Sequence, residues 1–235
     1  MKIDEIPAGD DARLQAKYQT IYRLLLVRYG EPQWRQHLPP VDELVSTILS
    51  QSTSDVNRDK GFYALKERYP DWESVMSAPE DDVRDTIRPA GLANQKGPRI
   101  QAALRFIVDE RGELSLDFLQ EMPVDEAMAW LMQIKGVGRK TASIVMLFAF
   151  GRPAFPVDTH VHRLSGRLGL ISPKVTADKA HGILENMGEA NTFYAFHLNL
   201  IRHGREVCVA RNPRCEICWL QEQCDYYQRL VSAGE

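Results

Sequence analysis

Apolar residues recur along this chain at intervals of three and four positions, which is the spacing of one face of an α-helix. The first such segment runs over residues 11–29, and Gly30 is a natural stop for it. Its apolar stripe consists of Leu14, Tyr18, Ile21, Leu25 and Tyr29. Alternation of apolar and polar residues, the pattern of a half-buried strand, is scarce. The pattern therefore predicts an all-α protein with short loops.

Capping and breaking residues mark the helix boundaries in the first half of the chain. One helix is predicted to begin near Pro40, and the next begins after Ser54, whose hydroxyl suits an N-cap. Pro79 divides the following segment into two short helices, and Gly112 ends a longer helix that starts near Asn94. Further helical segments follow, without an internal repeat or a low-complexity linker.

The stretch IKGVGRKTAS, residues 134–143, joins two apolar helical segments through a pair of glycines. Gly136 and Gly138 permit a positive φ and a close approach of the backbone, and Val137 between them is expected to be buried. The second helix should begin near Gly138, where its first N–H groups lack intrahelical partners and the helix dipole is positive. Such an end suits a phosphate, although an ordinary helix connection with a glycine cap has a similar pattern.

Local charge also favours a phosphate-rich partner. The 235 residues carry a net charge of −3, so a nucleic-acid site has to depend on local charge. Between residues 135 and 174 the only acid is Asp158. The basic residues of that range are Lys135, Arg139, Lys140, Arg152, Arg163, Arg167 and Lys174. Contacts from such residues grip the backbone of a nucleic acid without reading its sequence.

No stretch of the sequence approaches the roughly 20 apolar residues that a membrane span needs. Residues 1–15 also lack the apolar run of a signal peptide. We therefore expect a soluble protein of the cytoplasm that does not use a membrane as partner.

Lys140 breaks a local rule, because it places a cation in the first turn of a helix, where the dipole favours acids. The same field favours the neutral amine, which is the nucleophilic form. The spacing leaves three uses open for Lys140: a solvated charge, a phosphate contact or a nucleophile.

Asp158 suits an N-cap, since it follows an apolar stretch and precedes a helical pattern. A second interpretation is a carboxylate in a dry cleft facing Lys140, which stabilises positive charge on a sugar or relays protons.

All four cysteines fall in one short window with the spacing C-x6-C-x2-C-x5-C. A disulfide framework would scatter them along the chain, so this clustering favours a metal centre. Zinc and a [4Fe–4S] cluster both accept four thiolates. Zinc sites usually pair two short knuckles, and only one pair here has that spacing, so the pattern favours iron–sulfur. The expected ligands are Cys208, Cys215, Cys218 and Cys224.

Three segments in this order resemble the endonuclease III family, which are helix-hairpin-helix DNA glycosylases with a [4Fe–4S] cluster. The segments are IKGVGRKTA, FPVDTHVHRL and CVARNPRCEICWLQEQC, and the resemblance extends over about residues 24–226. It implies two helical lobes. One is a six-helix barrel over residues 33–152, with the helix-hairpin-helix at about 123–150. The other is an iron–sulfur cluster domain formed by residues 1–32 together with 153–235.

The resemblance also implies site residues. Lys140 matches the Schiff-base nucleophile of the family, and Asp158 matches its catalytic carboxylate. The phosphate-binding hairpin corresponds to Gly136, Val137, Gly138 and Arg139, with Lys135 where the family usually has proline. Other expected DNA contacts are Arg211 and Arg214 in the cluster loop.

One segment departs from the family pattern. In LSQSTSD, Ser52 stands where the family commonly has a glutamine that fills the gap left by the flipped base. Gln51 stands one position earlier. Both residues are expected to contact DNA, and the identity of the gap-filling residue stays open between them.

The implied function is that of a bifunctional DNA glycosylase and AP lyase of base excision repair. It would excise damaged bases, oxidised pyrimidines in particular, and nick the abasic strand by β-elimination. The expected partner is double-stranded DNA with damaged bases or abasic sites, bound by a monomer. Two alternatives stay open. One is a mismatch-directed glycosylase on the same scaffold, and the other is a non-catalytic DNA-binding protein with a structural cluster.

Overall fold

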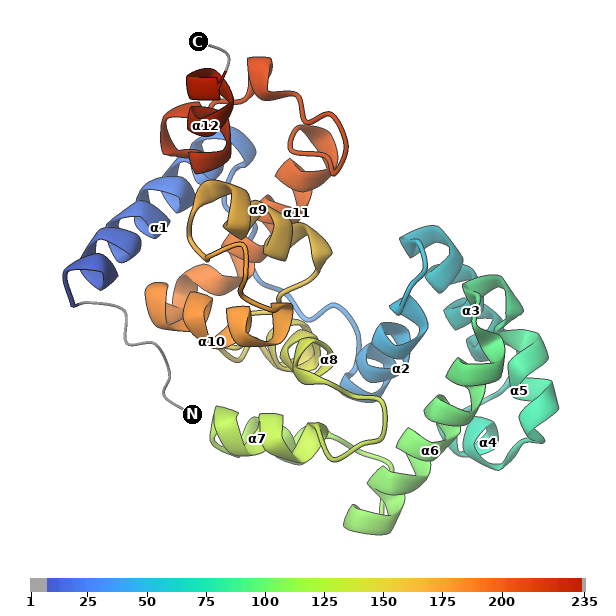
Figure 1. The fold of residues 1–235 in the computed structure, drawn as a ribbon. Helices are drawn as coiled ribbons and strands as arrows, with labels where there is room; N and C mark the ends of the chain where they lie inside the picture. The colour runs from blue at the N-terminus through green and yellow to red at the C-terminus, as the bar shows by residue number, and fades with distance from the viewer. Residues whose placement is uncertain (1–7, 234–235) are drawn as a thin grey trace. The chain divides into compact units, whose positions relative to one another are not determined.

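The computed structural model describes residues 8–233, and every regular element in that range is helical (Figure 1), which confirms the all-α prediction. Residues 1–7 and 234–235 lie outside the described residues. They include both ends of the expected cluster domain. Residues 1–7 are also part of the stretch 1–15 in which no signal peptide is expected. Over residues 8–233, no helix has both the length and the apolarity needed to cross a membrane. The chain forms two compact units, residues 35–152 and residues 1–34 together with 153–235.

The unit of residues 35–152 is built around α6, which packs against α2, α4 and α5. Its helices are α2 (Pro40–Ser50), α3 (Asp55–Arg68), α4 (Trp72–Ser77), α5 (Glu80–Thr86), α6 (Ala93–Arg111), α7 (Val124–Leu131) and α8 (Arg139–Ile144). The shorter helical pieces are η1 (Arg88–Ala90), η2 (Asp117–Gln120) and the π-helical η3 (Val145–Ala149). Figure 1 shows this unit in colours that run from blue at α2 through green to yellow at α8.

Local signals set most of these boundaries as predicted. Ser54 caps α3, since its Oγ accepts a hydrogen bond from Asn57 N at 3.3 Å. Gly112 ends α6 in the left-handed region, at φ 75°. Pro79 separates α4 from α5. The apolar segment after the glycine pair is helical, but it is not one regular α-helix. Its α-helical part ends at Ile144, and the chain continues as the π-helical turn η3.

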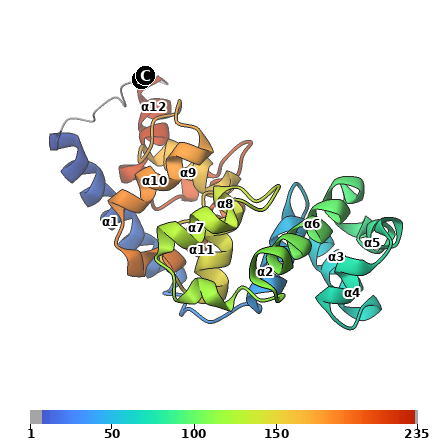
Figure 2. The same ribbon diagram turned by 90° about the horizontal axis from the view of Figure 1, so that it is seen from below.

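The second unit joins the N-terminal helix to the C-terminal third of the chain. Its elements are α1 (Ala8–Tyr29), α9 (Thr159–Leu168), α10 (Ala177–Met187), η4 (Ala190–Thr192), α11 (Phe193–Glu206), η5 (Cys215–Ile217), η6 (Gln221–Gln223) and α12 (Asp225–Ala233). Helix α1 packs on α10 and α11, and α9 packs on α11 and α12 (Figures 1 and 2). Tyr18, Ile21 and Leu25 of the predicted stripe are fully buried, with Tyr18 against Phe196 at 4.3 Å between ring centroids.

Candidate active site

The glycine turn between α7 and α8 has a backbone that only partly follows the sequence-based expectation. Gly136 has φ +89°, so it does occupy the region that favours glycine. Gly138 is extended at φ −96°, so it does not use its freedom to adopt a positive φ. A Cβ at Gly138 would meet nothing within 4 Å. Its lack of a side chain therefore keeps the backbone open to a close approach from outside.

Some backbone N–H groups of the glycine turn already donate hydrogen bonds within the protein, and only the others can bind a ligand. Val137 is buried, as predicted, and its N–H donates to Ile134 O at 2.9 Å. The side chain of Val137 thus anchors the turn, and its N–H is already used. Within residues 8–233, no backbone acceptor takes the N–H groups of Gly136 and Gly138. These two groups and the first turn of α8 are the donors left for an anion.

Helix α8 begins at Arg139, with Gly138 as its N-cap, so Lys140 is the second residue of its first turn. The side chain of Lys140 is exposed and Arg139 is half-buried. The predicted placement of a cation at the positive end of this helix is therefore confirmed. An amine in this position is available to a molecule that docks on the turn.

Some of the basic residues counted along the sequence have structural partners. Arg152 donates to the carbonyls of Gln120 and Met122. Arg163 donates to Gly204 O at 3.0 Å and to Cys208 O, and Arg167 donates to Val209 O and Ala210 O. These three guanidinium groups hold loops of their own units. The local excess of basic residues thus overstates the number of cations directed at a nucleic acid.

Gln51 and Ser52 follow α2 and differ sharply in environment. Gln51 Nε2 donates to Gly136 O at 3.2 Å, and Gln51 Oε1 accepts from Arg99 Nη1 at 3.1 Å. Ser52 has an exposed side chain and a left-handed backbone at φ 54°. Sequence reasoning missed Arg99, because its partner lies 48 positions away and no local pattern links them.

Asp158 is the N-cap of α9, as predicted, and its Oδ1 accepts a hydrogen bond from Val161 N at 2.7 Å. The carboxylate is half-buried, and no other hydrogen bond within residues 8–233 uses its Oδ2. Asp158 therefore has a fixed orientation and one oxygen available to a ligand.

The segment before Asp158 is held in place by buried polar side chains that the sequence did not reveal. Residues 154–157 are buried. His181 and His197, themselves 2% and 3% exposed, lie with Nδ1 at 2.8 and 2.9 Å from Phe155 O and Pro156 O. Glu185 Oε1 accepts from Phe155 N at 3.0 Å. Such support from a second layer of side chains gives the carboxylate that follows a defined position.

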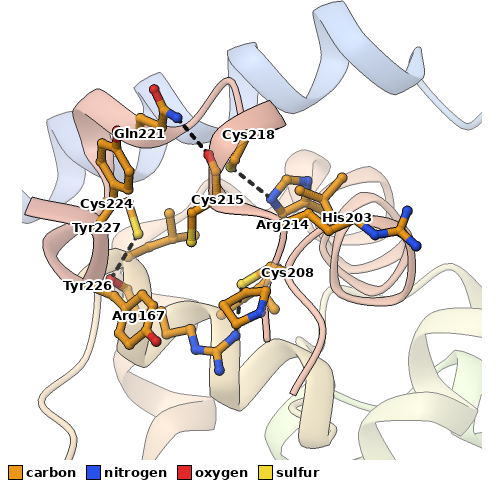
Figure 3. Close-up of a pocket in the computed structure, with 14 residues that line it drawn as sticks. Arg167, His203, Cys208, Arg214, Cys215, Cys218, Gln221, Cys224, Tyr226 and Tyr227 are labelled. Atoms are coloured by element: carbon orange, nitrogen blue, oxygen red, sulfur yellow. Dashed lines mark hydrogen bonds between the residues drawn. The ribbon is translucent and has the colours of Figure 1, made fainter. Parts of the chain in front are cut away.

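The four cysteines line one pocket at the C-terminal end of the second unit (Figure 3). Cys208 follows α11, Cys215 lies in η5, Cys218 follows it, and Cys224 precedes α12. Their side chains point toward a common space in Figure 3. None of the four forms a disulfide. The structure therefore brings together the residues that the spacing selected.

Two other side chains donate to or lie against the sulfur atoms. Arg167 Nη1 donates to Cys208 Sγ at 3.3 Å, and His203 Nε2 lies 3.5 Å from Cys218 Sγ. Burial lowers the pKa of His203 to about 4, so its ring is neutral at pH 7. Burial also raises the pKa of Cys218 to about 11. Four thiolates here would repel one another in a poorly solvated site, and a positively charged centre between them would offset that cost.

A single zinc ion and a [4Fe–4S] cluster require different arrangements of the four cysteine sulfur atoms. A single zinc ion needs all four sulfurs at about 2.3 Å from one point. No three His, Cys, Asp or Glu side chains in the described residues converge closely enough to hold one ion. Four thiols around one pocket are a donor set that zinc and a [4Fe–4S] cluster both accept. Arg211 and Arg214, in the loop between Cys208 and Cys215, are both exposed.

Residues 45–189 match the HhH-GPD superfamily of base excision DNA repair proteins. Endonuclease III of Thermotoga maritima is 34% identical to this chain over 198 residues, which cover 84% of this chain and 88% of the relative. Endonuclease III of Synechocystis sp. is 37% identical over 186 residues, which cover 79% of this chain and 80% of the relative.

A solved structure of a trapped covalent intermediate between endonuclease III and DNA matches the fold with a TM-score of 0.80. The two chains are 27% identical, and the match covers 92% of this chain and 98% of the other. The chain thus belongs to the HhH-GPD superfamily of base excision DNA repair proteins and, within it, to the endonuclease III family. The resemblance found in the three sequence segments is confirmed.

Proposed function

We propose that this chain is a bifunctional DNA glycosylase and AP lyase that acts on double-stranded DNA with damaged bases or abasic sites. The observation that carries the proposal is the exposed Lys140 in the first turn of α8, next to a glycine turn with unused N–H groups. The turn supplies backbone donors for a phosphate, and the lysine supplies the amine. Oxidised pyrimidines are the proposed substrates, and the bacterial cytoplasm is the proposed place of action.

Lys140 is the proposed nucleophile. A base inside the helical stack is out of reach, so the damaged nucleotide is flipped out of the duplex first. The neutral Nζ then forms a bond to C1′ of the sugar while the bond from C1′ to the base breaks, and the base leaves with a proton. The sugar ring then opens, because the C1′–O4′ bond breaks, O4′ takes a proton and the nitrogen lone pair forms the C=N bond. The resulting Schiff base makes the proton on C2′ acidic. Its removal expels the 3′ phosphate by β-elimination, which nicks the strand.

Asp158 is the proposed catalytic carboxylate. Positive charge builds up on the sugar as the base leaves, and a carboxylate of fixed orientation stabilises that charge. Its capping role supports the proposal, because Oδ1 is committed to Val161 N while Oδ2 stays available. A carboxylate can also assist proton transfer during the reaction.

We also propose that Cys208, Cys215, Cys218 and Cys224 hold a [4Fe–4S] cluster, so that residues 1–34 and 153–235 form the cluster domain. The shared pocket, the free thiols and the spacing of the four cysteines support this assignment. Cys208 and Cys215 would hold the cluster at the two ends of one loop, and these bonds would restrain the loop between them. Arg211 and Arg214 on that loop are exposed and are proposed phosphate contacts.

A panel of duplexes tests the proposal. Each duplex carries one lesion, namely thymine glycol, an oxidised cytosine, uracil, an abasic site or a mismatch, and base release and strand scission are scored separately. The proposal predicts release of oxidised pyrimidines together with scission, and scission of the abasic duplex. Base release from a mismatch without scission would favour a mismatch-directed glycosylase. Binding without either reaction would favour a non-catalytic DNA-binding protein.

A further inference from the structure

Gln51 lies in the middle of a hydrogen-bonded chain that joins α6 to the glycine turn. Its Nε2 donates to Gly136 O at 3.2 Å, and its Oε1 accepts from Arg99 Nη1 at 3.1 Å. A guanidinium can only donate and a carbonyl can only accept, so the two partners fix which way the amide points. Both ends of the Gln51 side chain are therefore committed within the protein.

Arg99 also touches the turn through its aliphatic stem. A Cβ built on Gly136 would lie 3.2 Å from Arg99 Cδ and 3.5 Å from Arg99 Nε. Gly136 is also the residue of the turn with a positive φ, at +89°. Arg99 thus occupies the space beside Gly136 directly and holds its carbonyl through Gln51.

Lys96, three residues before Arg99 on the same helix, holds the backbone that leads to Gln51. Its side chain is 1% exposed, and Nζ donates to Leu49 O at 2.7 Å and to Ala90 O at 2.8 Å. Leu49 lies in the last turn of α2, where the helix dipole is negative, so an ammonium group is favoured there. Helix α6 therefore holds this part of the chain at two points. Lys96 binds the carbonyl of Leu49, two residues before Gln51, and Arg99 binds the Gln51 side chain.

We propose that Arg99, acting through Gln51, is a positioning residue for the glycine turn. The pair fixes the Gly136 carbonyl, and with it the peptide plane between Gly136 and Val137. That plane lies between the N–H groups of Gly136 and Gly138, so holding it restricts the part of the turn that is proposed to face a DNA phosphate. This inference rests on the proposed role of the turn in DNA binding. It also means that the Gln51 side chain stays in the protein frame and does not enter the base stack. Ser52 is left as the exposed side chain of that loop.

The physical benefit is a turn that is ordered before DNA arrives. A mobile turn would lose conformational freedom on binding, and that cost would weaken the complex. A turn that the protein already orders avoids that cost. Loss of the hydrogen-bonded chain from Arg99 through Gln51 to Gly136, called the relay below, should therefore weaken DNA binding.

Binding of a duplex with a tetrahydrofuran abasic analogue, followed by fluorescence anisotropy at several salt concentrations, tests the relay. The variants are Gln51→Ala, Arg99→Ala and the double variant. Each single change should raise Kd by about five- to tenfold, since it removes one hydrogen-bonded link. The double variant should match either single variant, because both break the same chain. Arg105→Ala is the matched control, since Arg105 is exposed on the same helix and donates to Met76 O at 3.0 Å. Its Kd should equal that of the unmodified protein.

Three results would overturn the positioning role. Losses that multiply in the double variant would show that Gln51 and Arg99 act separately. A salt dependence reduced by about one ion in Arg99→Ala would show a direct phosphate contact. A Gln51→Ala effect that changes with the base opposite the analogue would place Gln51 inside the duplex. Gln51→Met keeps the length of the side chain without its hydrogen bonds, and it replaces Gln51→Ala if that variant does not fold.

Borohydride trapping at saturating enzyme separates this inference from the proposed function. The variants should still form the covalent adduct, because the nucleophile is untouched, and a complete loss of the adduct at saturating enzyme would count against a role limited to positioning. An unmodified protein that forms no adduct would overturn the lyase proposal. The relay would still be judged by the Kd values, which do not depend on the chemical step.

Discussion

Asp158 Oδ1 accepts a hydrogen bond from Val161 N at 2.7 Å, so the proposed catalytic carboxylate is also the N-cap of α9. The two roles can be separated by substitution. Asparagine caps a helix about as well as aspartate, so Asp158→Asn should leave the free energy of unfolding within about 0.5 kcal/mol. The same change removes the charge, so single-turnover base release should fall by about 100-fold or more. Asp158→Ala should lose that activity and also about 1 kcal/mol of stability.

Asp71 provides a matched control for the cap. It is the N-cap of α4, and its Oδ1 accepts from Ser74 N at 2.7 Å. Asp71→Ala should lower the free energy of unfolding but leave base release at its original rate. Unchanged base release in Asp158→Asn would show that the carboxylate has only a capping role.

Glu43 of α2 should make stability depend on pH. Its side chain is 7% exposed, and burial raises its pKa to about 7. The folded state therefore binds a proton that the unfolded state has released, so stability falls as pH rises from about 4.5 to about 7. Glu43→Gln removes this proton uptake and should raise the free energy of unfolding at pH 8 by ~1–3 kcal/mol.

Urea unfolding at pH 5, 6, 7 and 8 measures the contribution of Glu43. Glu73→Gln is the control, because Glu73 is an exposed acid of α4. This control should keep the pH slope of the unmodified protein, whereas Glu43→Gln should flatten it. Equal slopes in both variants would mean that Glu43 is ionised in the folded protein.

Leu92 has a strained backbone conformation, so its replacement should change the stability of the protein. It is 49% exposed and has φ 49°, a region that costs a leucine about 1 kcal/mol or more. It also lines an open pocket with Arg84, Arg88, Ala93, Asn94 and Gln95. Leu92→Gly relieves the strain, so the melting temperature should rise in a thermal unfolding experiment. An unchanged or lower melting temperature would show that the left-handed backbone at Leu92 costs the fold no stability.

The cysteine pocket predicts the metal content. Protein isolated without oxygen should be brown and contain about four iron atoms per chain. Cys218→Ser should lose iron and visible absorbance together. Arg214→Ala, which changes the same loop but not a ligand, should keep the iron and weaken DNA binding by removing about one phosphate contact. A colourless protein with one zinc per chain would contradict the cluster assignment.

Local signals in the sequence were enough to predict the helices and much of the proposed site. Ser54, Gly112 and Asp158 act on residues three to five positions away, and the structure has each of them in the expected cap. The cysteine window was equally direct, because its spacing already limits the four thiols to one loop region. These features depend on short-range geometry, which a single sequence carries.

Long-range pairs were not visible in the sequence. Arg99 meets Gln51 across 48 positions, and His197 reaches Pro156 O across 41. Lys96 lies in a polar stretch yet is buried, because two carbonyls of other elements surround its ammonium group. The spacing of apolar residues identifies the buried face of a helix. It therefore does not identify a buried cation or a histidine that binds a distant carbonyl. The sequence also did not say which conformation Gly138 adopts, since glycine permits several conformations and its neighbours select one.

Borohydride trapping on an abasic duplex tests the central proposal most directly. The unmodified protein should form a covalent adduct with DNA, and Lys140→Ala should form none while it still binds the duplex. Lys135→Ala is the comparison, because Lys135 is an exposed lysine of the same turn. It should bind DNA more weakly but still be trapped at saturating enzyme. Undiminished trapping of Lys140→Ala would contradict the assignment of Lys140 as the nucleophile.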